Sequence, residues 1–284
     1  VKDQFSTHRR TEIIDWAGDM EDEDLIERED MVVTITSGGY IKRTPLADFR
    51  AQRRGGKGLA GMQTKDEDVV TTLFVANTHT QLLFFSTDGM AYKLKTWRLP
   101  LGARTAKGKA IVNILPIQAG VSIAAVMPVD APEEEWEKLQ IIFSTSSGDV
   151  RRNALSDFTN VRSNGKIAMD LPEDITLVNA RIANEDDDVM LVTDSGRAIR
   201  FSTTAVRVFK GRKSTGVRGI KLMAYEKVVS MSIIRHFEAS PDERSAYLKM
   251  RRAVAGMSDD AVGSPEEEDE EINAFTSRIR SQTS

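Results

Sequence analysis

Residues 52–58 combine three cationic side chains with three glycines, in the order Gln52, Arg53, Arg54, Gly55, Gly56, Lys57 and Gly58. Arg and Lys donate charge-assisted hydrogen bonds to phosphate oxygens. Glycine lets backbone N–H groups approach an anion without a Cβ in the way. Taken alone, such a run is as typical of a solvated turn as of a loop that binds a polyanion. Weaker versions of the same loop recur along the chain, and this recurrence favours a binding role.

The chain contains four copies of one unit, which consists of an apolar run, a glycine turn, a second run with cations and a Gly/basic loop. The turn glycines are Gly39, Gly89, Gly148 and Gly196, and the late glycines of the loops are Gly58, Gly108, Gly165 and Gly216. Successive turns are about 50 to 60 positions apart, and each turn precedes the late glycine of its loop by roughly 17 to 20 positions. Two distances that agree over four copies indicate a structural repeat.

The glycine turns lie between short runs of β-branched and aromatic residues, which predicts β-hairpins because such turns need positive φ. A further strand-like run follows each loop, at residues 69–75, 123–127, 177–182 and 228–234. Each unit therefore holds about four short strands and no long helical segment. Such a period predicts an all-β fold of radially arranged, four-stranded blades, as in a propeller, with four blades recognisable.

Composition excludes several classes of protein. The chain of 284 residues has 40% hydrophobic residues, enough for a core, and no cysteine, which excludes disulfides and thiolate metal sites. No apolar stretch approaches the roughly 20 residues that span a bilayer. The first residues are polar, and the chain starts at Val1 within a charged segment. We therefore expect a cytoplasmic protein with no membrane partner, and part of a longer polypeptide.

Charge is unevenly distributed along the chain. Residues 1–30 hold 4 Lys/Arg and 11 Asp/Glu, residues 31–234 hold 28 and 21, and residues 235–284 hold 7 and 11. The repeats are thus a basic body between two acidic ends, although the net charge of the chain is −4. Since the Gly/basic loops occur once per unit, radial blades would place them around a rim.

The C-terminal segment, residues 235–284, differs in character from the repeats. Ser240-Pro241-Asp242-Glu243 has the pattern of a capping box and predicts a helix over residues 243–253. The run 266–271 is entirely acidic and predicts a disordered segment, which is more typical of a solvated linker than of a regulatory tail. We expect three parts: a linker at 1–29, the blades at 30–234 and a charged insertion at 235–284.

The sequence offers little evidence for a catalytic site or a metal site. Residues 56–61 match G-x-G-x-x-G, but a charged loop precedes them and no helical pattern follows, which argues against a dinucleotide site. The histidines, His8, His79 and His236, lie in three different regions without ligand spacing. The acidic runs 133–135 and 186–188 are better explained as solvated loops. We expect neither a catalytic residue nor a metal site.

These residues together resemble one family. Residues 52–58 are similar to the signature box of the DNA gyrase A subunit, and the four units resemble its C-terminal β-pinwheel. The likeness extends over residues 1–234, including the segments 5–13, 29–34, 73–78, 111–116 and 215–220. The family has six blades, so the resemblance implies a fragment in which residues 235–284 begin an insertion after blade four.

The resemblance implies that duplex DNA wraps around the rim in a right-handed sense, so that ATP-driven strand passage elsewhere in the enzyme introduces negative supercoils. It also implies the gyrase B subunit in an A2B2 complex and the rest of the A subunit as partners, in bacterial cytoplasm at the nucleoid. The whole enzyme is an ATP-hydrolysing type IIA topoisomerase that uses ATP and Mg²⁺ bound outside this fragment. None of the four tyrosines stands in a cleavage motif, so we expect the fragment itself to be non-catalytic and to hold no cofactor.

Double-stranded DNA is thus the expected ligand, and spaced cations in glycine loops suit phosphate binding with little base reading. Two alternatives remain: the C-terminal domain of the topoisomerase IV A subunit, and a propeller-type scaffold for protein interaction. The expected DNA-binding residues are the basic side chains and glycines of the four loops, namely Gln52, Arg53, Arg54, Gly55, Gly56, Lys57, Gly58, Arg43, Arg104, Lys107, Lys109, Arg162, Lys166, Arg212, Lys213 and Arg218.

Overall fold

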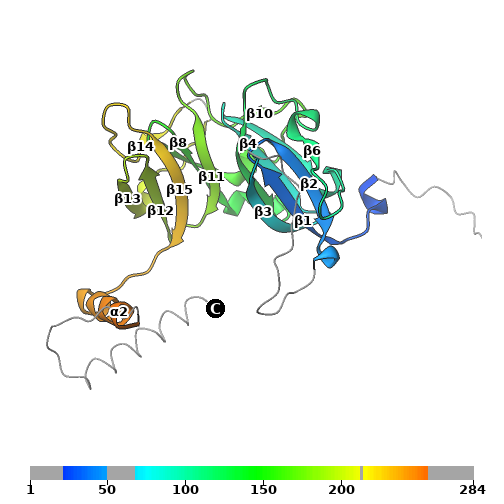
Figure 1. Cartoon of the computed structure of the whole chain (residues 1–284). Coiled ribbons are helices and arrows are strands. Elements are labelled where there is room, and N and C mark those ends of the chain that lie inside the picture. Colours follow the sequence, from blue (N-terminus) through cyan, green and yellow to red (C-terminus); the bar gives the residue numbers. More distant parts are fainter. Residues whose placement is uncertain (1–21, 50–67, 212–213, 255–284) are drawn as a thin grey trace, which may run out of the picture. The chain divides into compact units, whose positions relative to one another are not determined.

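The computed structural model describes residues 22–49, 68–211 and 214–254. The chain forms two compact units, Val1–Ile234 and Arg235–Ser284. Four antiparallel sheets lie in sequence order across the first unit (Figure 1). This arrangement confirms the predicted all-β, pinwheel-like fold with four blades, which we number one to four in chain order.

Each blade is built on a hairpin whose strands are an apolar run and the cation-bearing run after it. The turn glycines of all four hairpins have φ between 76° and 84°, so the conformation that the turn requires explains the repeated glycine. The hairpins are β1 (Asp30–Thr36) with β2 (Tyr40–Pro45), β4 (Gln81–Ser86) with β5 (Met90–Lys95), β8 (Gln140–Thr145) with β9 (Asp149–Ala154), and β12 (Asp187–Thr193) with β13 (Ala198–Ser202).

The strand after each Gly/basic loop pairs with the first strand of its own hairpin. In blade one, for example, Met31 of β1 lies opposite Ala76 of β3. These third strands are β3 (Val70–Asn77), β7 (Ile123–Val129), β11 (Leu177–Ala183) and β15 (Val228–Arg235). The predicted strand-like run of every unit is therefore a strand.

The fourth strand of a sheet comes from the loop of the following unit. β6 (Lys109–Ala110), from the second unit's loop, pairs with β2 of blade one. In the same way β10 (Lys166–Ile167) pairs with β5, and β14 (Val217–Arg218) pairs with β9. The sequence predicts four strands per unit, but it does not predict that one of them joins the sheet of the preceding blade.

The first strands of blades two and three are buried on both faces, because each lies between two cores. Phe84 of β4 packs in the core of blades one and two, whereas Phe85 packs in the core of blades two and three. Ile141 and Ile142 of β8 divide in the same way between two cores. Since alternate strand residues point to opposite faces, a continuous apolar run serves both neighbours.

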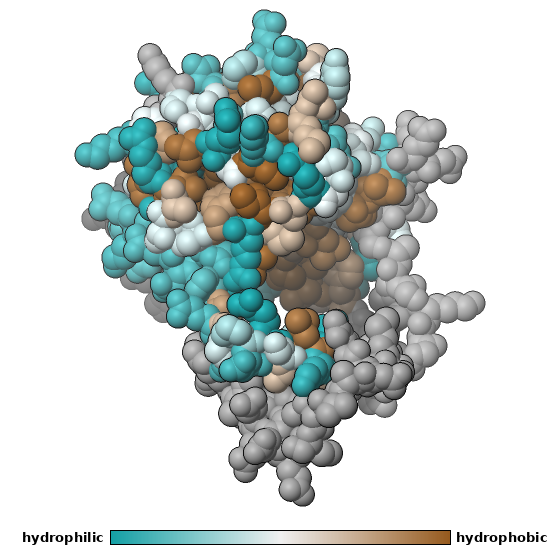
Figure 2. Space-filling view, turned by 90° about the vertical axis from the view of Figure 1, so that its left-hand side faces the viewer, coloured by the Kyte–Doolittle hydropathy of each residue, from teal (hydrophilic) through white to brown (hydrophobic). Residues whose placement is uncertain are grey.

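Blade four differs from the others at its outer edge. Among the described residues its sheet has three strands, in the order β13, β12, β15, and none pairs with the outer edge of β13. Ile199 of β13 is 37% exposed, whereas Lys42, Tyr92 and Arg151, at the same position of the other hairpins, are at most 4% exposed. Figure 2 looks onto the blade-four side, where apolar side chains reach the surface among hydrophilic ones.

Short 3-10 helices precede and connect the strands of the first unit. They are η1 (Asp22–Leu25), η2 (Leu46–Asp48), η3 (Thr96–Arg98), η4 (Ile111–Asn113), η5 (Glu133–Lys138), η6 (Leu155–Phe158) and η7 (Thr203–Ala205). Trp136 of η5 is fully buried, and its indole N–H donates to the Ala131 carbonyl at 2.9 Å.

The described part of the second unit, residues 235–254, contains the helix α2 (Pro241–Val254). Its capping box forms as predicted: the Glu243 N–H donates to Ser240 Oγ at 3.2 Å, and the Ser240 N–H donates to Glu243 Oε2 at 2.8 Å. The predicted disordered run 266–271 lies outside the described residues. No helix in the described ranges has the length and hydropathy needed to cross a bilayer.

Candidate nucleic-acid interface

Three Gly/basic loops are described, and each is anchored on the hairpin turn of the preceding blade. The carbonyl of the turn glycine accepts the anchoring hydrogen bond in every case. Gly39 O accepts from the Ile111 N–H at 2.8 Å, Gly89 O from Ala168 at 2.9 Å and Gly148 O from Gly219 at 2.8 Å. The loops are therefore held at the outer edges of successive sheets, once per blade.

The late glycines of two loops, Gly108 and Gly216, lie against the backbone of the neighbouring strand. Gly108 and Gly216 have φ of 80° and 105°. A Cβ on Gly108 would lie 2.5 Å from the Ile41 carbonyl oxygen, and one on Gly216 would lie 2.2 Å from that of Val150. In these two loops the late glycine thus allows close contact with the backbone of the neighbouring strand.

Two cations of the hairpins are buried and hold the loops in place. The Lys42 ammonium donates to the carbonyls of Ala103 (3.0 Å) and Arg104 (2.5 Å), and burial lowers the pKa of Lys42. Arg151 donates to the Ser214 carbonyl at 2.6 Å, to Asn153 Oδ1 at 2.8 Å and to the Ala168 carbonyl. Both side chains are fully buried. They are structural, so part of the positive charge counted between residues 31 and 234 is not available to a ligand.

Seven of the predicted DNA-binding residues are described. Lys109, Arg162 and Arg218 are exposed, one in each described loop. The other four are partly buried. The Lys166 ammonium donates to the Asp157 carbonyl at 2.6 Å, and the Arg43 Nε–H donates to the Leu99 carbonyl at 2.9 Å. The Lys107 ammonium lies 3.7 Å from the centre of the Tyr40 ring, and the Arg104 carbonyl accepts from Lys42.

Burial also lowers the pKa of Arg43, although nearby Glu29 opposes the shift. The remaining predicted residues lie outside the described ranges: Gln52, Arg53, Arg54, Gly55, Gly56, Lys57, Gly58, Arg212 and Lys213.

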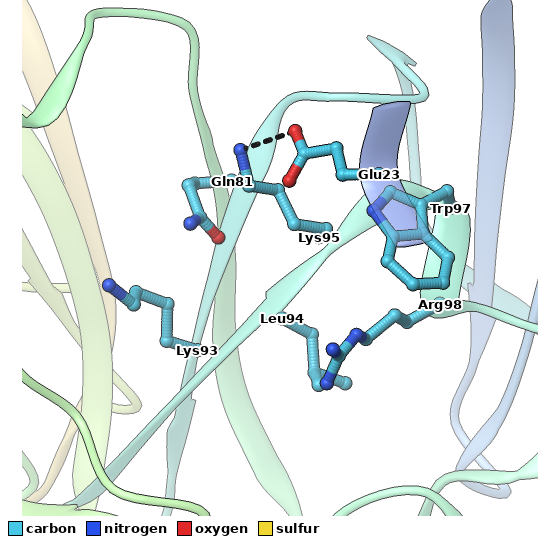
Figure 3. Close-up of a pocket in the computed structure, with 7 residues that line it drawn as sticks. All are labelled: Glu23, Gln81, Lys93, Leu94, Lys95, Trp97 and Arg98. Atoms are coloured by element: carbon cyan, nitrogen blue, oxygen red, sulfur yellow. Dashed lines mark ion pairs between the residues drawn. The ribbon is translucent and has the colours of Figure 1, made fainter. Parts of the chain in front are cut away.

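A basic pocket on blade two was not among the predicted sites. It encloses about 590 Å³ and is lined by Glu23, Gln81, Lys93, Leu94, Lys95, Trp97 and Arg98 (Figure 3). Lys93 and Lys95 point from the same face of β5, since strand residues two apart share a face. Arg98 follows in η3, and its guanidinium lies 5.0 Å from the centre of the Trp97 ring. The pocket thus gathers three cations beside one aromatic ring.

Two carboxylates face these cations. Lys95 pairs with Glu23 at 3.0 Å, and Lys93 pairs with Glu133 at 2.7 Å. The Lys93 ammonium also donates to the Thr159 carbonyl, in the segment that leads to the loop of Arg162. The indole N–H of Trp97 is buried and has no hydrogen-bond partner among the described residues. The pocket therefore adjoins a basic loop.

The alternation Lys93-Leu94-Lys95 is the sequence signal for this pocket, because it places two cations on one face of a predicted strand. Glu23 has no such signal, since it lies far from Lys93 in the sequence and reaches the pocket only through the folded chain.

Comparison with known proteins identifies the same four repeats. A family model described as "DNA gyrase C-terminal domain, beta-propeller" matches four segments, 30–77, 80–130, 140–184 and 187–235. The DNA gyrase A subunit of Granulibacter bethesdensis is 49% identical over 265 residues, which cover 91% of this chain and 28% of that protein. The corresponding protein of Rickettsia bellii is 46% identical over 250 residues, covering 88% of the chain and 28% of the protein. The chain thus spans just over a quarter of these relatives.

Solved structures show the same fold. The C-terminal domain of DNA topoisomerase IV aligns with a TM-score of 0.62 at 26% identity, over 74% of this chain and 63% of that one. A DNA gyrase A C-terminal domain aligns with a TM-score of 0.56 at 25% identity, over 72% and 64%. The four matched repeats and the blades that they form place this chain in the family of DNA gyrase C-terminal, propeller-like domains.

Proposed function

We propose that this chain binds and bends duplex DNA as the C-terminal, wrapping part of a DNA gyrase A subunit. The observation that carries the proposal is the exposed cation in each described loop, at Lys109, Arg162 and Arg218. Each loop is anchored on the turn of the preceding blade, so the cations recur with the blades. Cations spaced in this way suit the phosphates of a duplex that follows the rim, and they need no base contacts.

In the complete enzyme the wrapped duplex would be presented to the cleavage core in the rest of the A subunit, while the B subunit supplies ATP-driven strand passage. The loop 52–58 holds three cations, as many as the loops 104–109 and 211–219, and is proposed as a further contact to DNA. Cleavage is proposed to depend on a tyrosine outside this chain. The fragment would then act on DNA topology only through the path that it gives to the duplex.

The topoisomerase IV domain is the second candidate, because its solved structure aligns with the higher TM-score. Support for gyrase comes from the gyrase A subunits of two species, which are 49% and 46% identical over 91% and 88% of this chain, since the solved gyrase and topoisomerase IV domains have nearly equal identities of 25% and 26%. The two candidates share DNA as ligand and differ in how much of it they wrap.

Binding to a labelled linear duplex, measured by fluorescence anisotropy across a salt series, tests the proposal. Each phosphate neutralised adds close to −0.9 to the slope of log affinity against log salt. The slope measured for the wild-type chain should therefore be several times this value. Replacing Lys109, Arg162 and Arg218 together by alanine should make this slope less negative by up to about 3. Duplexes of different sequence should bind alike.

A matched control replaces three exposed lysines outside the loops, Lys138, Lys221 and Lys227, by alanine, which changes the net charge equally. This control should keep most of the slope. A wild-type slope near zero would contradict DNA binding and favour a scaffold, and equal losses in both triple variants would mean that only overall charge matters.

A further inference from the structure

The basic pocket of blade two is lined on one side by an acidic segment of the same chain. Residues 22–30 contain six Asp or Glu and one Arg. Glu23, in η1, directs its carboxylate to Lys95, as the dashed line in Figure 3 shows. Carboxylate and phosphate oxygens are the same class of acceptor for an ammonium group. Glu23 therefore occupies a position that a phosphate oxygen could take.

Hydrogen bonds hold this segment against the connection between β3 and β4, which joins blades one and two. The Thr78 hydroxyl donates to the Glu27 carbonyl at 2.8 Å, and the Thr78 N–H donates to the Glu29 carbonyl at 2.8 Å. The His79 ring Nε2 lies 3.3 Å from the Glu23 carbonyl, to which it can only donate. These contacts keep Glu23 next to Lys95 at little further entropic cost, which gives the carboxylate a high local concentration.

The charges of the pocket favour an anion once Glu23 leaves. Lys93, Lys95 and Arg98 supply three positive charges, and Glu133 remains paired with Lys93. The Lys95–Glu23 ion pair is only partly buried, with side chains 28% and 27% exposed. A ligand can therefore compete with Glu23 for Lys95.

We propose that this pocket is a phosphate subsite on the DNA path and that Glu23 is its internal competitor, so that the acidic segment 22–30 restrains DNA binding. The inference rests on the proposed function, because the ligand is a backbone phosphate of duplex DNA. The link between Lys93 and the Thr159 carbonyl connects the pocket to the loop of Arg162. A duplex on that loop passes the pocket, and its phosphate displaces the Glu23 carboxylate from Lys95.

Replacing Glu23 by glutamine in the full chain tests the competition. Glu23→Gln keeps the size of the side chain and removes its charge, so a fluorescein-labelled duplex should bind about two- to fivefold more tightly at low salt, the range expected for a partly exposed ion pair. The gain should shrink as salt rises, because the Debye length falls from about 30 Å at 0.01 M to about 8 Å at 0.15 M.

Glu27→Gln is the matched control, since it changes the same charge in the same segment at an exposed side chain outside the pocket. Its affinity should stay close to that of wild type. A second pair of variants, Lys95→Gln with and without Glu23→Gln, tests the partner: without Lys95 the gain from Glu23→Gln should largely disappear. Melting curves of all variants confirm that each is folded.

The outcomes separate the two proposals. Normal salt-dependent binding with no gain in Glu23→Gln, or with an equal gain in Glu27→Gln, would overturn the competition and leave the proposed function standing. A full gain that persists without Lys95 would also overturn it, because Glu23 would then act elsewhere. Absence of duplex binding in every variant would overturn the proposed function and this inference with it.

Discussion

Single residues decide how closely one blade lies against the loop of the next. The late loop glycine and the turn glycine both have positive φ, but their surroundings differ. A Cβ on Gly216 would meet the Val150 carbonyl oxygen at 2.2 Å, whereas one on the turn glycine Gly196 would have nothing within 4 Å. The same residue type thus answers two requirements, one of backbone conformation and one of space.

Gly216→Ala should therefore destabilise the fold by about 2–4 kcal/mol, since left-handed strain and a backbone clash combine. Gly196→Ala should cost only the strain, about 1–2 kcal/mol. Gly211→Ala, where φ is not positive and the space is open, should stay within about 0.5 kcal/mol of wild type. Guanidinium denaturation followed by tryptophan fluorescence measures all three, and equal losses at Gly216 and Gly196 would contradict the close approach.

A carboxylate joins the blade-four turn to the loop before β15. Glu226 accepts from the Arg197 Nε–H at 2.9 Å, from the Met223 N–H at 2.7 Å and from the Ser195 hydroxyl. The Arg197 hydrogen bond, followed by those of Met223 and Ser195, holds the pKa of Glu226 well below its usual range.

A depressed pKa makes this contribution to stability depend on pH. It is fully present above the unfolded carboxyl pKa, about 4.3, and is lost as pH falls toward the lower pKa of the folded state. Glu226→Gln should therefore melt at a lower temperature than wild type near pH 7, and the gap should narrow below about pH 4. Thermal melts of both proteins at about pH 7 and about pH 3 test this. A difference in melting temperature that stays constant down to about pH 3 would show that the charge of Glu226 is unimportant.

At the scale of elements, cations of the hairpins and cations of the loops have different tasks. Arg151 of β9 is buried and donates to carbonyls of two other segments, whereas Arg218 of β14 is exposed. The sequence shows both only as basic residues near glycine. The structure assigns the first to holding a loop, and we propose the second for phosphate.

Arg151→Met, which keeps most of the side-chain volume, should lower the free energy of unfolding by roughly 2–4 kcal/mol because buried carbonyls lose a charged donor. Arg218→Ala should leave stability within about 0.5 kcal/mol of wild type and weaken binding to duplex DNA. Parallel denaturation and anisotropy measurements separate the roles. A loss of stability in Arg218→Ala as large as in Arg151→Met would show that both cations are structural.

At the scale of the whole array, neighbouring blades are joined by shared cores and by a short strand that each unit's loop adds to the preceding blade. Three sheets include a short strand from a loop of another unit, and apolar clusters lie between successive blades. Blade four receives no such strand among the described residues, and Ile199 on β13 is left partly exposed. Stability should therefore be lowest at this end, as expected where each repeat depends on its neighbours.

Native-state hydrogen exchange resolves this gradient. Amides in β13 should exchange faster than those in β2, β5 and β9, the equivalent strands of the other blades, because only β13 has an open outer edge in the described structure. The turn of blade four should show intermediate protection, since Glu226 secures it. Equal protection in β2, β5, β9 and β13 would contradict the idea that the short strands β6, β10 and β14 stabilise the outer edges of the sheets that they join.

The sequence by itself determined what depends on neighbouring residues: the four hairpins, since Gly39 and its equivalents need positive φ, the period of the blades, and the capping box at Ser240. Only the tertiary structure decided which segments distant along the chain meet. It buried Lys42 and Arg151 under the next unit's loop, paired β6 with β2, and brought Glu23 to Lys95. Those contacts join residues about 60 to 70 positions apart, where local propensity carries no information and only the packing of whole blades selects the partner.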